Sequence, residues 1–279
     1  MNSNLSLKKH FVIKDDHSRS IVGDISYNDI SSEKLVIFCH GYKGYKDWGC
    51  WNLVADLFAK NGFKFLKFNF SHNGGTVENP IDFPDLDAFS KNNYSIEVQD
   101  VSRVIKYIKE SEAEEFKFND LFLIGHSRGG GIASISASNE TMISKLSTWA
   151  SVSNFANRFP NEVEIEKWKM EGIRFVENKR TLQMMPHLYQ FYTDFIENKD
   201  KLDIKESLKK FNGEVLICHG SLDLAVHHEN ASNLHVWSNK SELYKIRSNH
   251  TFGAKHPWEG NDLPSDLKNV CLKTISFFN

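Results

Sequence analysis

The 279-residue sequence contains no apolar run long enough to cross a membrane, since such a span needs about 20 consecutive apolar residues. Residues 1–9 also lack the apolar core of a secretory signal peptide. Charge of one sign is not in excess: 34 Lys and Arg stand against 36 Asp and Glu, for a formal net charge of -2 at pH 7. This balance gives no electrostatic reason to expect nucleic acid or an anionic membrane surface as a partner.

Cysteine is scarce, with four residues in the chain and no C-x-x-C spacing. Cys39 and Cys218 fall in apolar segments that we expect to be buried strands, where small apolar thiols are common. The twelve histidines show no H-E-x-x-H or similar ligand spacing, and adjacent His227 and His228 would point in different directions on a helix. We therefore expect no metal site and a reduced, cytoplasmic protein.

The sequence alternates short apolar runs with amphipathic stretches, which is typical of a mostly parallel sheet covered by helices. A hairpin is expected within residues 11–27. Further strands are expected at residues 35–39, 63–70, 121–124, 146–152, 215–218 and 243–246. Helices are expected at residues 51–60, 93–110 and 264–278. No internal repeat or low-complexity segment interrupts this order.

One block, residues 155–212, breaks the alternation because it is rich in Lys, Glu, Met and aromatic residues. It predicts several helices inserted above the sheet, which divides the chain into an α/β core at 1–154 and 213–279 and a helical cap at 155–212. The block could be a surface insertion that packs its aromatic residues on the core. It could also shape a pocket with an adaptable apolar wall, and the two interpretations are compatible.

The most informative motif is G-x-S-x-G at residues 125–129, which directly follows the apolar run at 121–124. Small residues then open a predicted helix. A strand, a glycine-flanked serine and a helix in this order describe a nucleophile elbow, a tight turn that exposes the serine hydroxyl above a sheet. Gly125 and Gly129 would let strand and helix approach closely. Ser127 is therefore the candidate nucleophile.

A serine nucleophile needs a base and an orienting acid, which follow it in the chain order serine, acid, histidine. Asp223 is the candidate acid because it lies in a turn after the strand at 215–218. His250 is the candidate base because it comes shortly after the strand ending at Ile246. His256 is the main competitor for this role, although its neighbour Trp258 favours a packing or pocket function.

The tetrahedral intermediate of such a reaction needs two preorganised donors for its oxyanion. The backbone N–H of Arg128, the residue after Ser127, is the first candidate, and this role does not need the arginine side chain. The backbone N–H of Tyr42 is the second, because His40-Gly41-Tyr42 directly follows the strand at 35–39.

These motifs together resemble those of the α/β-hydrolase superfamily over nearly the whole chain. The segments that carry the resemblance are His40-Gly41-Tyr42, Gly125-His126-Ser127-Arg128-Gly129-Gly130, His219-Gly220-Ser221-Leu222-Asp223 and Asn249-His250. Within the superfamily, the chain resembles feruloyl and cinnamoyl esterase-like enzymes and their dienelactone-hydrolase and peptidase S9-like relatives. Residues 69–74 resemble the loop that follows the fourth strand in these enzymes, and residues 85–89 precede the next helix.

The resemblance implies an eight-stranded, mostly parallel sheet, an acyl-enzyme intermediate and no cofactor. It also implies Ser127 as nucleophile, Asp223 as acid and His250 as base. Two features depart from the relatives: Arg128 replaces the residue that commonly follows the nucleophile, and the composition of residues 155–212 matches no substrate class.

We therefore expect a serine hydrolase that acts on a small-molecule carboxylic ester, with no nucleic-acid or membrane partner. A peptidase or amidase of the same fold would use the same triad on a poorer leaving group, and a thioesterase is equally compatible with the sequence. A non-catalytic binding protein that keeps the fold and its pocket is the remaining alternative.

Overall fold

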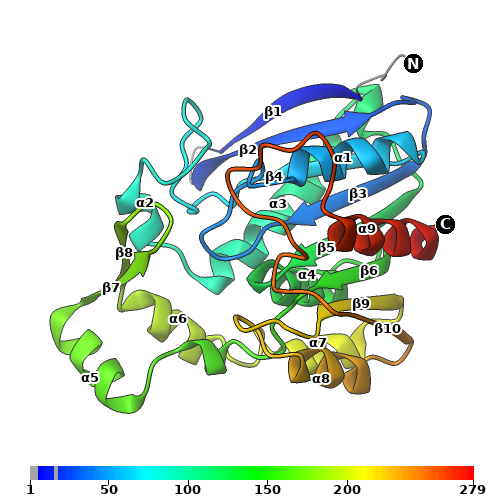
Figure 1. Cartoon of the computed structure of the whole chain (residues 1–279). Helices are drawn as coiled ribbons and strands as arrows, with labels where there is room; N and C mark the ends of the chain where they lie inside the picture. The colour runs from blue at the N-terminus through cyan, green and yellow to red at the C-terminus, as the bar shows by residue number, and fades with distance from the viewer. Residues whose placement is uncertain (1–5, 16–17) are drawn as a thin grey trace.

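The computed structural model describes residues 6–15 and 18–279, and an eight-stranded sheet forms its centre (Figure 1). The strand order is β1-β2-β4-β3-β5-β6-β9-β10. The bounds are β1 (Leu7–Asp15), β2 (Ser18–Tyr27), β3 (Lys34–Cys39), β4 (Lys64–Phe68), β5 (Asp120–His126), β6 (Ile143–Trp149), β9 (Glu214–Gly220) and β10 (Ser241–Ile246).

Only the first part of this sheet is antiparallel: β1 pairs antiparallel with β2, and β2 pairs antiparallel with β4. The pairs from β4 through β3, β5, β6 and β9 to β10 are all parallel. The prediction of an eight-stranded, mostly parallel sheet is confirmed. Since parallel strands end at the same edge, the loops that follow β3, β5, β9 and β10 meet there.

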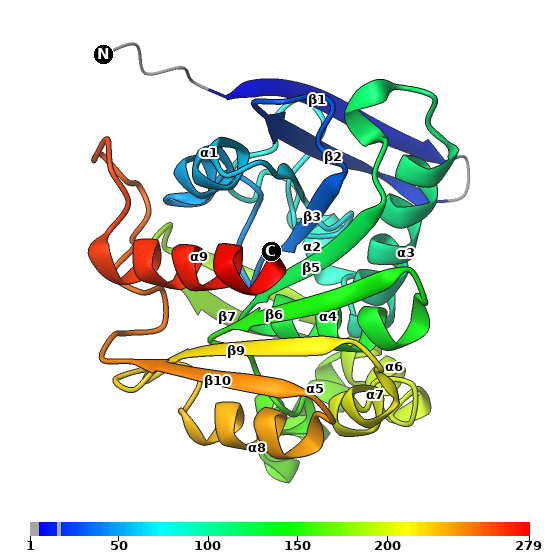
Figure 2. The same ribbon diagram turned by 90° about the vertical axis from the view of Figure 1, so that its right-hand side faces the viewer.

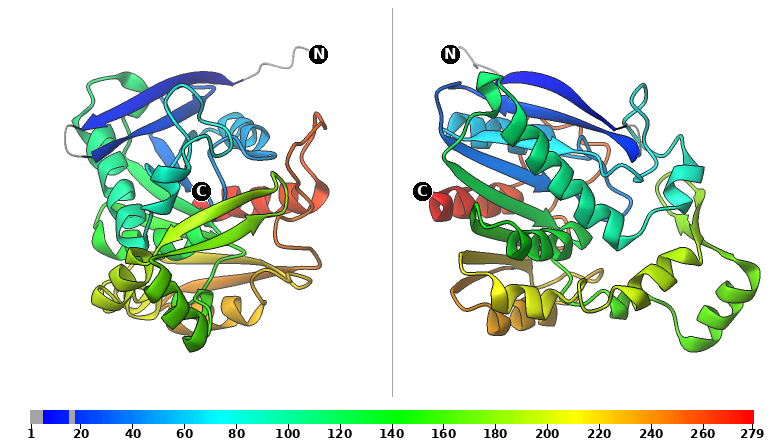
Figure 3. Two further views of the ribbon diagram at one scale, coloured as in Figure 1. Left: turned by 90° about the vertical axis from the view of Figure 1, so that its left-hand side faces the viewer. Right: turned by 180° about the vertical axis from the view of Figure 1, so that it is seen from behind.

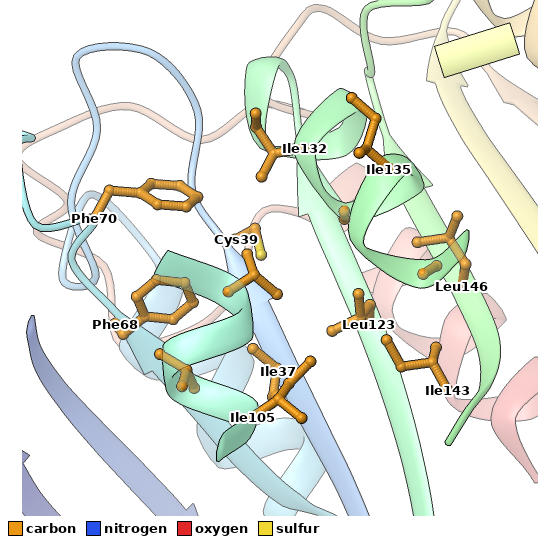
Figure 4. Packing of buried hydrophobic residues seen from close by; sticks show 14 of the residues in the cluster. Ile37, Cys39, Phe68, Phe70, Ile105, Leu123, Ile132, Ile135, Ile143 and Leu146 are labelled. Carbon is orange, nitrogen blue, oxygen red and sulfur yellow. The ribbon is translucent and has the colours of Figure 1, made fainter. Parts of the chain in front are cut away.

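The central strands are apolar throughout because the sheet is buried on both faces. In β3, Ile37 and Cys39 pack in the core on one face, whereas Val36 and Phe38 pack in the core on the other. Figure 4 shows the first of these cores, in which Ile37 and residues of the neighbouring strands meet side chains such as Ile105 and Ile132 of the covering helices.

Helices cover the two faces unequally (Figure 2). The apolar residues of α1 (Trp51–Lys60) and α9 (Ser265–Phe278) belong to the core that contains Val36 and Phe38. The opposite core contains residues of α3, α4, α7 and α8. Their bounds are α3 (Tyr94–Glu110), α4 (Arg128–Asn139), α7 (Ile204–Lys210) and α8 (Glu229–Trp237).

The chain between β6 and β9 leaves the sheet at the edge where the parallel strands end (Figure 3). Its main elements are α5 (Glu162–Glu171), β7 (Ile173–Asn178), β8 (Gln183–Leu188), α6 (Gln190–Glu197) and α7. The antiparallel hairpin of β7 and β8 was not part of the sequence prediction, which expected helices only. Its turn, residues 179–182, contains no glycine, asparagine or aspartate to mark it, and Pro186 lies inside β8.

This inserted segment is attached to the core at several points. β8 contacts α2 (Leu86–Ser90), and α6 contacts α3. α7 packs against α4 and α8 beside the sheet, although it lies within the predicted cap range 155–212. The hairpin thus lies beside α2, and α5 is the part of the segment that stands away from the core helices (Figure 1).

A buried ionic cluster ties the loop after β3 to strands β2 and β4. Asp24 of β2 and Lys67 of β4 are fully buried cross-strand partners, with 2.7 Å between Asp24 Oδ2 and Lys67 Nζ. Lys46 Nζ donates to the same oxygen at 2.7 Å, and both lysines also pair with Asp47. Burial alone would raise the pKa of Asp24, but Lys67 and Lys46 hold it below its ordinary value. Asp24 therefore stays ionised and, through Lys46, holds the loop that follows β3 against strands β2 and β4.

Replacing Asp24 with asparagine is expected to lower the free energy of unfolding by about 3–5 kcal/mol, because two buried lysines would then share one carboxylate, that of partly exposed Asp47. Urea unfolding at pH 7 measures the change. Asp200→Asn, a change of the same chemistry at an exposed position, should alter stability by less than about 0.5 kcal/mol. If the two variants were equally stable, the cluster would not have this role.

Candidate active site

Ser127 lies at the turn between β5 and α4 with a strained backbone. Its φ of 57° and ψ of -120° are values that a residue with a Cβ rarely adopts, at a cost of about 1–3 kcal/mol. The turn is held because the Ser127 N–H donates to the Trp149 carbonyl at 2.9 Å and the Gly130 N–H donates to the Ser127 carbonyl at 3.0 Å. The elbow geometry predicted from the motif is present.

The glycines on either side of Ser127 allow the close approach on which this turn depends. A Cβ on Gly125 would stand 2.2 Å from the Gly129 carbonyl oxygen. A Cβ on Gly129 would stand 2.4 Å from the carbonyl oxygens of Cys39 and His40 at the end of β3. Both contacts are with backbone, which cannot move aside, so these positions exclude side chains.

The structure brings Ser127, His250 and Asp223 into one hydrogen-bonded chain. His250 Nε2 lies 3.0 Å from Ser127 Oγ, and His250 Nδ1 lies 2.7 Å from Asp223 Oδ2. Because a carboxylate only accepts, His250 carries its proton on Nδ1, and its Nε2 accepts from the serine hydroxyl. The three residues follow β5, β9 and β10, whose parallel ends bring together positions up to 123 residues apart.

Asp223 is held as a carboxylate by donors on both of its oxygens. Its Oδ1 accepts from the N–H groups of Ala225 and Val226 at 2.8 and 2.9 Å. Its Oδ2 faces His250 and, at 3.4 Å, Nε2 of His219. Burial would raise the pKa of Asp223, but its interactions with His219 and His250 hold it well below its usual range. The group opposite His250 is therefore charged at neutral pH.

The neighbouring histidines have structural partners. His126 Nε2 donates to the His250 carbonyl at 3.0 Å and so fixes the backbone of that residue. His219 Nε2 donates to the Val226 carbonyl at 2.9 Å. His256 Nδ1 accepts from the Gly49 N–H at 2.8 Å, which leaves Nε2–H for the Tyr45 hydroxyl at 2.7 Å. His256 is thus engaged by the loop after β3, while His250 is the histidine that reaches Ser127.

That loop also lies directly against Ser127. A Cβ on Gly41 would stand 3.0 Å from Ser127 Cβ, so the backbone entering Tyr42 passes beside the elbow. Arg128 occupies the first helical position of α4, where a backbone N–H has no carbonyl of its own helix to bond. Both residues predicted as oxyanion donors are therefore next to Ser127.

Two cavities meet at Ser127, His250, Tyr42 and Val176. The first, of about 420 Å³, extends under α5 and α6, where Trp168 and Phe191 line it. The second, of about 570 Å³, extends toward Trp48 and Trp51 and the turn of the β7–β8 hairpin. An ester carbonyl at Ser127 would thus have space for a group on either side, and the inserted segment contributes to both walls.

The side chain of Arg128 is a feature that the sequence analysis did not foresee. It is 12% exposed, its Nη1 donates to Glu97 Oε1 at 3.2 Å, and its guanidinium lies 4.2 Å from the centroid of the Tyr42 ring. Glu97 could have been noticed because it falls on the apolar face of α3, in spacing with Val101 and Val104. A carboxylate on such a face needs a buried partner.

A second unforeseen residue is His187 of β8, which lines the first cavity. Its Nε2 lies 2.7 Å from the Tyr42 hydroxyl, so the hairpin is bonded to the loop that follows β3. Burial and the nearby cations Arg128, Arg174 and Lys43 lower the pKa of His187 to about 3, which keeps its ring neutral. No motif marked this position because the hairpin itself was not predicted.

Acid is expected to destabilise the fold through buried histidines. Burial lowers the pKa of His40 to about 4 and those of His126 and His187 to about 3, from 6.5. Between these values and pH 6.5 the unfolded chain binds more protons, so stability falls as pH falls, by on the order of 1 kcal/mol per pH unit for each histidine. Asp100, with its pKa raised by burial from 3.8 to about 6, opposes part of this.

Melting temperatures measured by circular dichroism at pH 7.5, 6.5, 5.5 and 4.5 test this expectation. The melting temperature should be nearly constant above pH 6.5 and should decrease at each lower step. A constant melting temperature down to pH 4.5 would show that the buried neutral histidines do not reduce stability in acid.

None of the helices in the described residues combines the length and apolarity needed to span a bilayer. Within residues 6–15 and 18–279, no three His, Cys, Asp or Glu side chains are grouped so that they could hold a metal ion.

No protein-family model and no curated protein sequence matches the chain. Solved structures do match it over nearly its whole length. Est1E from Butyrivibrio proteoclasticus, in a structure with bound ferulic acid, has a TM-score of 0.70 and 17% identity, with 96% of this chain and 97% of that chain covered. Dienelactone hydrolase from Anabaena variabilis has a TM-score of 0.66 and 12% identity, with 99% and 98% covered.

Alpha/beta hydrolase domain-containing protein 10 from mouse is similar to the same degree, with a TM-score of 0.66, 14% identity, and 96% of this chain and 98% of that chain covered. The chain therefore has the α/β-hydrolase fold. The resemblance inferred from the sequence motifs is confirmed at this level, and the activity has to be argued from the site.

Proposed function

We propose that the protein is a serine hydrolase that cleaves a small carboxylic ester through an acyl-enzyme intermediate. The observation that carries this proposal is the hydrogen-bonded chain Ser127–His250–Asp223 at a nucleophile elbow, with distances of 3.0 and 2.7 Å. The fold gives further support, because Est1E and dienelactone hydrolase share it.

In the proposed reaction, Ser127 Oγ attacks the ester carbonyl as His250 Nε2 takes the hydroxyl proton. The imidazolium that forms is stabilised by the Asp223 carboxylate, and the N–H groups of Tyr42 and Arg128 donate to the oxyanion. His250 then returns the proton to the leaving alcohol as the carbon–oxygen bond breaks. Water, activated by His250 in the same way, attacks the acyl-enzyme and releases the acid and Ser127.

Hydrolysis of 4-nitrophenyl esters from acetate to octanoate tests the proposal. We expect turnover that is greatest for short acyl chains, because the cavity under α5 and α6 is about 420 Å³ and is lined largely by aromatic side chains. Anilides and thioesters with the same acyl groups separate ester hydrolysis from the amidase and thioesterase alternatives. A fluorophosphonate probe should label the protein at Ser127.

Three results would contradict the proposal. Labelling without turnover of any ester would indicate a reactive serine with another substrate, and absence of both would favour a non-catalytic binding protein. Faster turnover of the matched thioester or anilide, after correction for its intrinsic reactivity, would move the assignment to a thioesterase or an amidase.

A further inference from the structure

The cavity under α5 and α6 is lined by three arginines, Arg128, Arg158 and Arg174, and by none of the described aspartates or glutamates. The charge of Arg128 is balanced by Glu97, which pairs with its guanidinium and does not line the cavity. Among the described residues, neither Arg158 nor Arg174 has such a carboxylate partner. The cavity beside the candidate nucleophile therefore has an excess of positive charge.

Arg174 lies on β7 of the hairpin and is half-buried. Among residues 6–15 and 18–279, its guanidinium has neither an ion-pair partner nor a hydrogen-bond acceptor. Arg158 is exposed, and its Nη1 donates to the Ala225 carbonyl at 3.2 Å, while no carboxylate of the described residues pairs with it. Two guanidinium groups at a cavity that no described carboxylate lines favour an anionic group there.

Tyr42 and His187 both line this cavity, and the pair that they form has one more donor without a partner among the described residues. His187 is 5% exposed, and its Nδ1 has no hydrogen-bond partner in the described part of the chain. If the Tyr42 hydroxyl donates to Nε2, the proton of the neutral ring is on Nδ1, which is then free to donate. If Nε2 donates instead, the Tyr42 hydroxyl is free. Each tautomer leaves one donor unused.

The remaining lining is largely aromatic, and its volume of about 420 Å³ lies in the range of small-molecule sites. Aromatic rings from the core and from the inserted segment form the walls: Tyr94, Phe155, Phe159, Trp168 and Phe191. Such walls suit a hydrocarbon or aromatic body. The guanidinium groups of Arg158 and Arg174 favour a ligand that also carries a negative charge.

We propose that this cavity binds a substrate arm that ends in a carboxylate, with Arg174 and Arg158 as its binding residues. The planar guanidinium fork of arginine matches a carboxylate in two parallel hydrogen bonds. The inference rests on the proposed function, because it defines the substrate as an ester with a free carboxylate on one arm, such as a half-ester of a dicarboxylic acid.

Paired substrates test the proposal on each arm of the ester. The first pair is mono-4-nitrophenyl glutarate, with a carboxylate on the acyl arm, and neutral 4-nitrophenyl pentanoate. The second pair is 4-carboxyphenyl butyrate, with a carboxylate on the leaving group, and neutral 4-acetylphenyl butyrate. In one of the two pairs, kcat/KM for the anionic member should exceed that for the neutral member by at least about tenfold.

Arg174→Gln should reduce that ratio by about tenfold, with turnover of the neutral member changed less than twofold. Arg174→Lys, which keeps the charge but loses the fork, should give an intermediate ratio. Lys169→Gln is the matched control, because it removes one positive charge from the same inserted segment. Lys169 is an exposed residue of α5 that lines neither cavity. It should leave the ratio unchanged.

Binding separates failure of this inference from failure of the proposed function. Calorimetric titration of Ser127→Ala with mono-4-nitrophenyl glutarate should show binding that the added Arg174→Gln change weakens about tenfold. Such binding without any esterase activity in the native protein would overturn the proposed function and keep the carboxylate site. Neutral esters turned over as well as anionic ones in both pairs, or a preference that survives Arg158→Gln with Arg174→Gln, would overturn the carboxylate site.

Discussion

Replacing Ser127 with alanine is expected to lower kcat by on the order of 10⁴- to 10⁶-fold on any ester that the protein hydrolyses. The reason is that Ser127 Oγ is the only atom at the elbow that can form the acyl bond, and His250 Nε2 would face a methyl group in the variant. Initial rates with 4-nitrophenyl acetate, measured at enzyme concentrations high enough to detect residual turnover, give the ratio.

The fold should survive this change. Serine and alanine both carry a Cβ, so the strained φ of 57° at position 127 costs the variant about what it costs the native chain. Ser138→Ala, on the same helix and away from both cavities, is the matched control and should keep full activity. If Ser127→Ala retained more than about one hundredth of native turnover, Ser127 would not be the nucleophile.

Replacing Asp223 with asparagine should have the second large effect, a decrease in kcat on the order of 10⁴-fold. The asparagine oxygen can replace Oδ1, which accepts from Ala225 and Val226, and its amide group then faces His250. An amide donates, so His250 Nδ1 becomes an acceptor and its proton moves to Nε2. In that tautomer, Nε2 cannot accept the proton of Ser127 Oγ.

The rate of labelling by a fluorophosphonate distinguishes this tautomer effect from a loss of the fold. We expect labelling to slow in proportion to kcat while the circular dichroism spectrum stays native. Asp200→Asn serves again as the exposed control. An Asp223→Asn variant within tenfold of native activity would show that His250 is oriented by another group.

The order of elements and the position of the elbow could be predicted from the sequence because both are local. Apolar runs such as residues 35–39 and 121–124 indicate strands by themselves, and the small residues around Ser127 indicate a tight turn. The proximity of Ser127, Asp223 and His250 follows from one further rule, that parallel strands end at one edge.

What the sequence could not predict depends on contacts between distant segments. The Arg128 side chain has its partner, Glu97, on another helix, and neither residue indicates the other in the sequence. The β7–β8 hairpin was missed because none of its turn residues 179–182 is a glycine, asparagine or aspartate, and His187 and Arg174 were missed with it. The residues that define the cavity beside Ser127 are therefore mostly those that only the three-dimensional arrangement identifies.

The burial of the cysteines has a practical consequence. All four, Cys39, Cys50, Cys218 and Cys271, are unpaired and fully buried, and burial raises the pKa of each thiol, to about 11 for Cys50 and to about 12 for Cys218. Maleimide reagents need an accessible thiolate, so they should spare the native chain. A single cysteine introduced at exposed Leu182, in the hairpin turn, would then be a unique attachment point for a fluorophore. The native sequence thus already provides a background in which a fluorophore on that turn would report whether it moves during turnover.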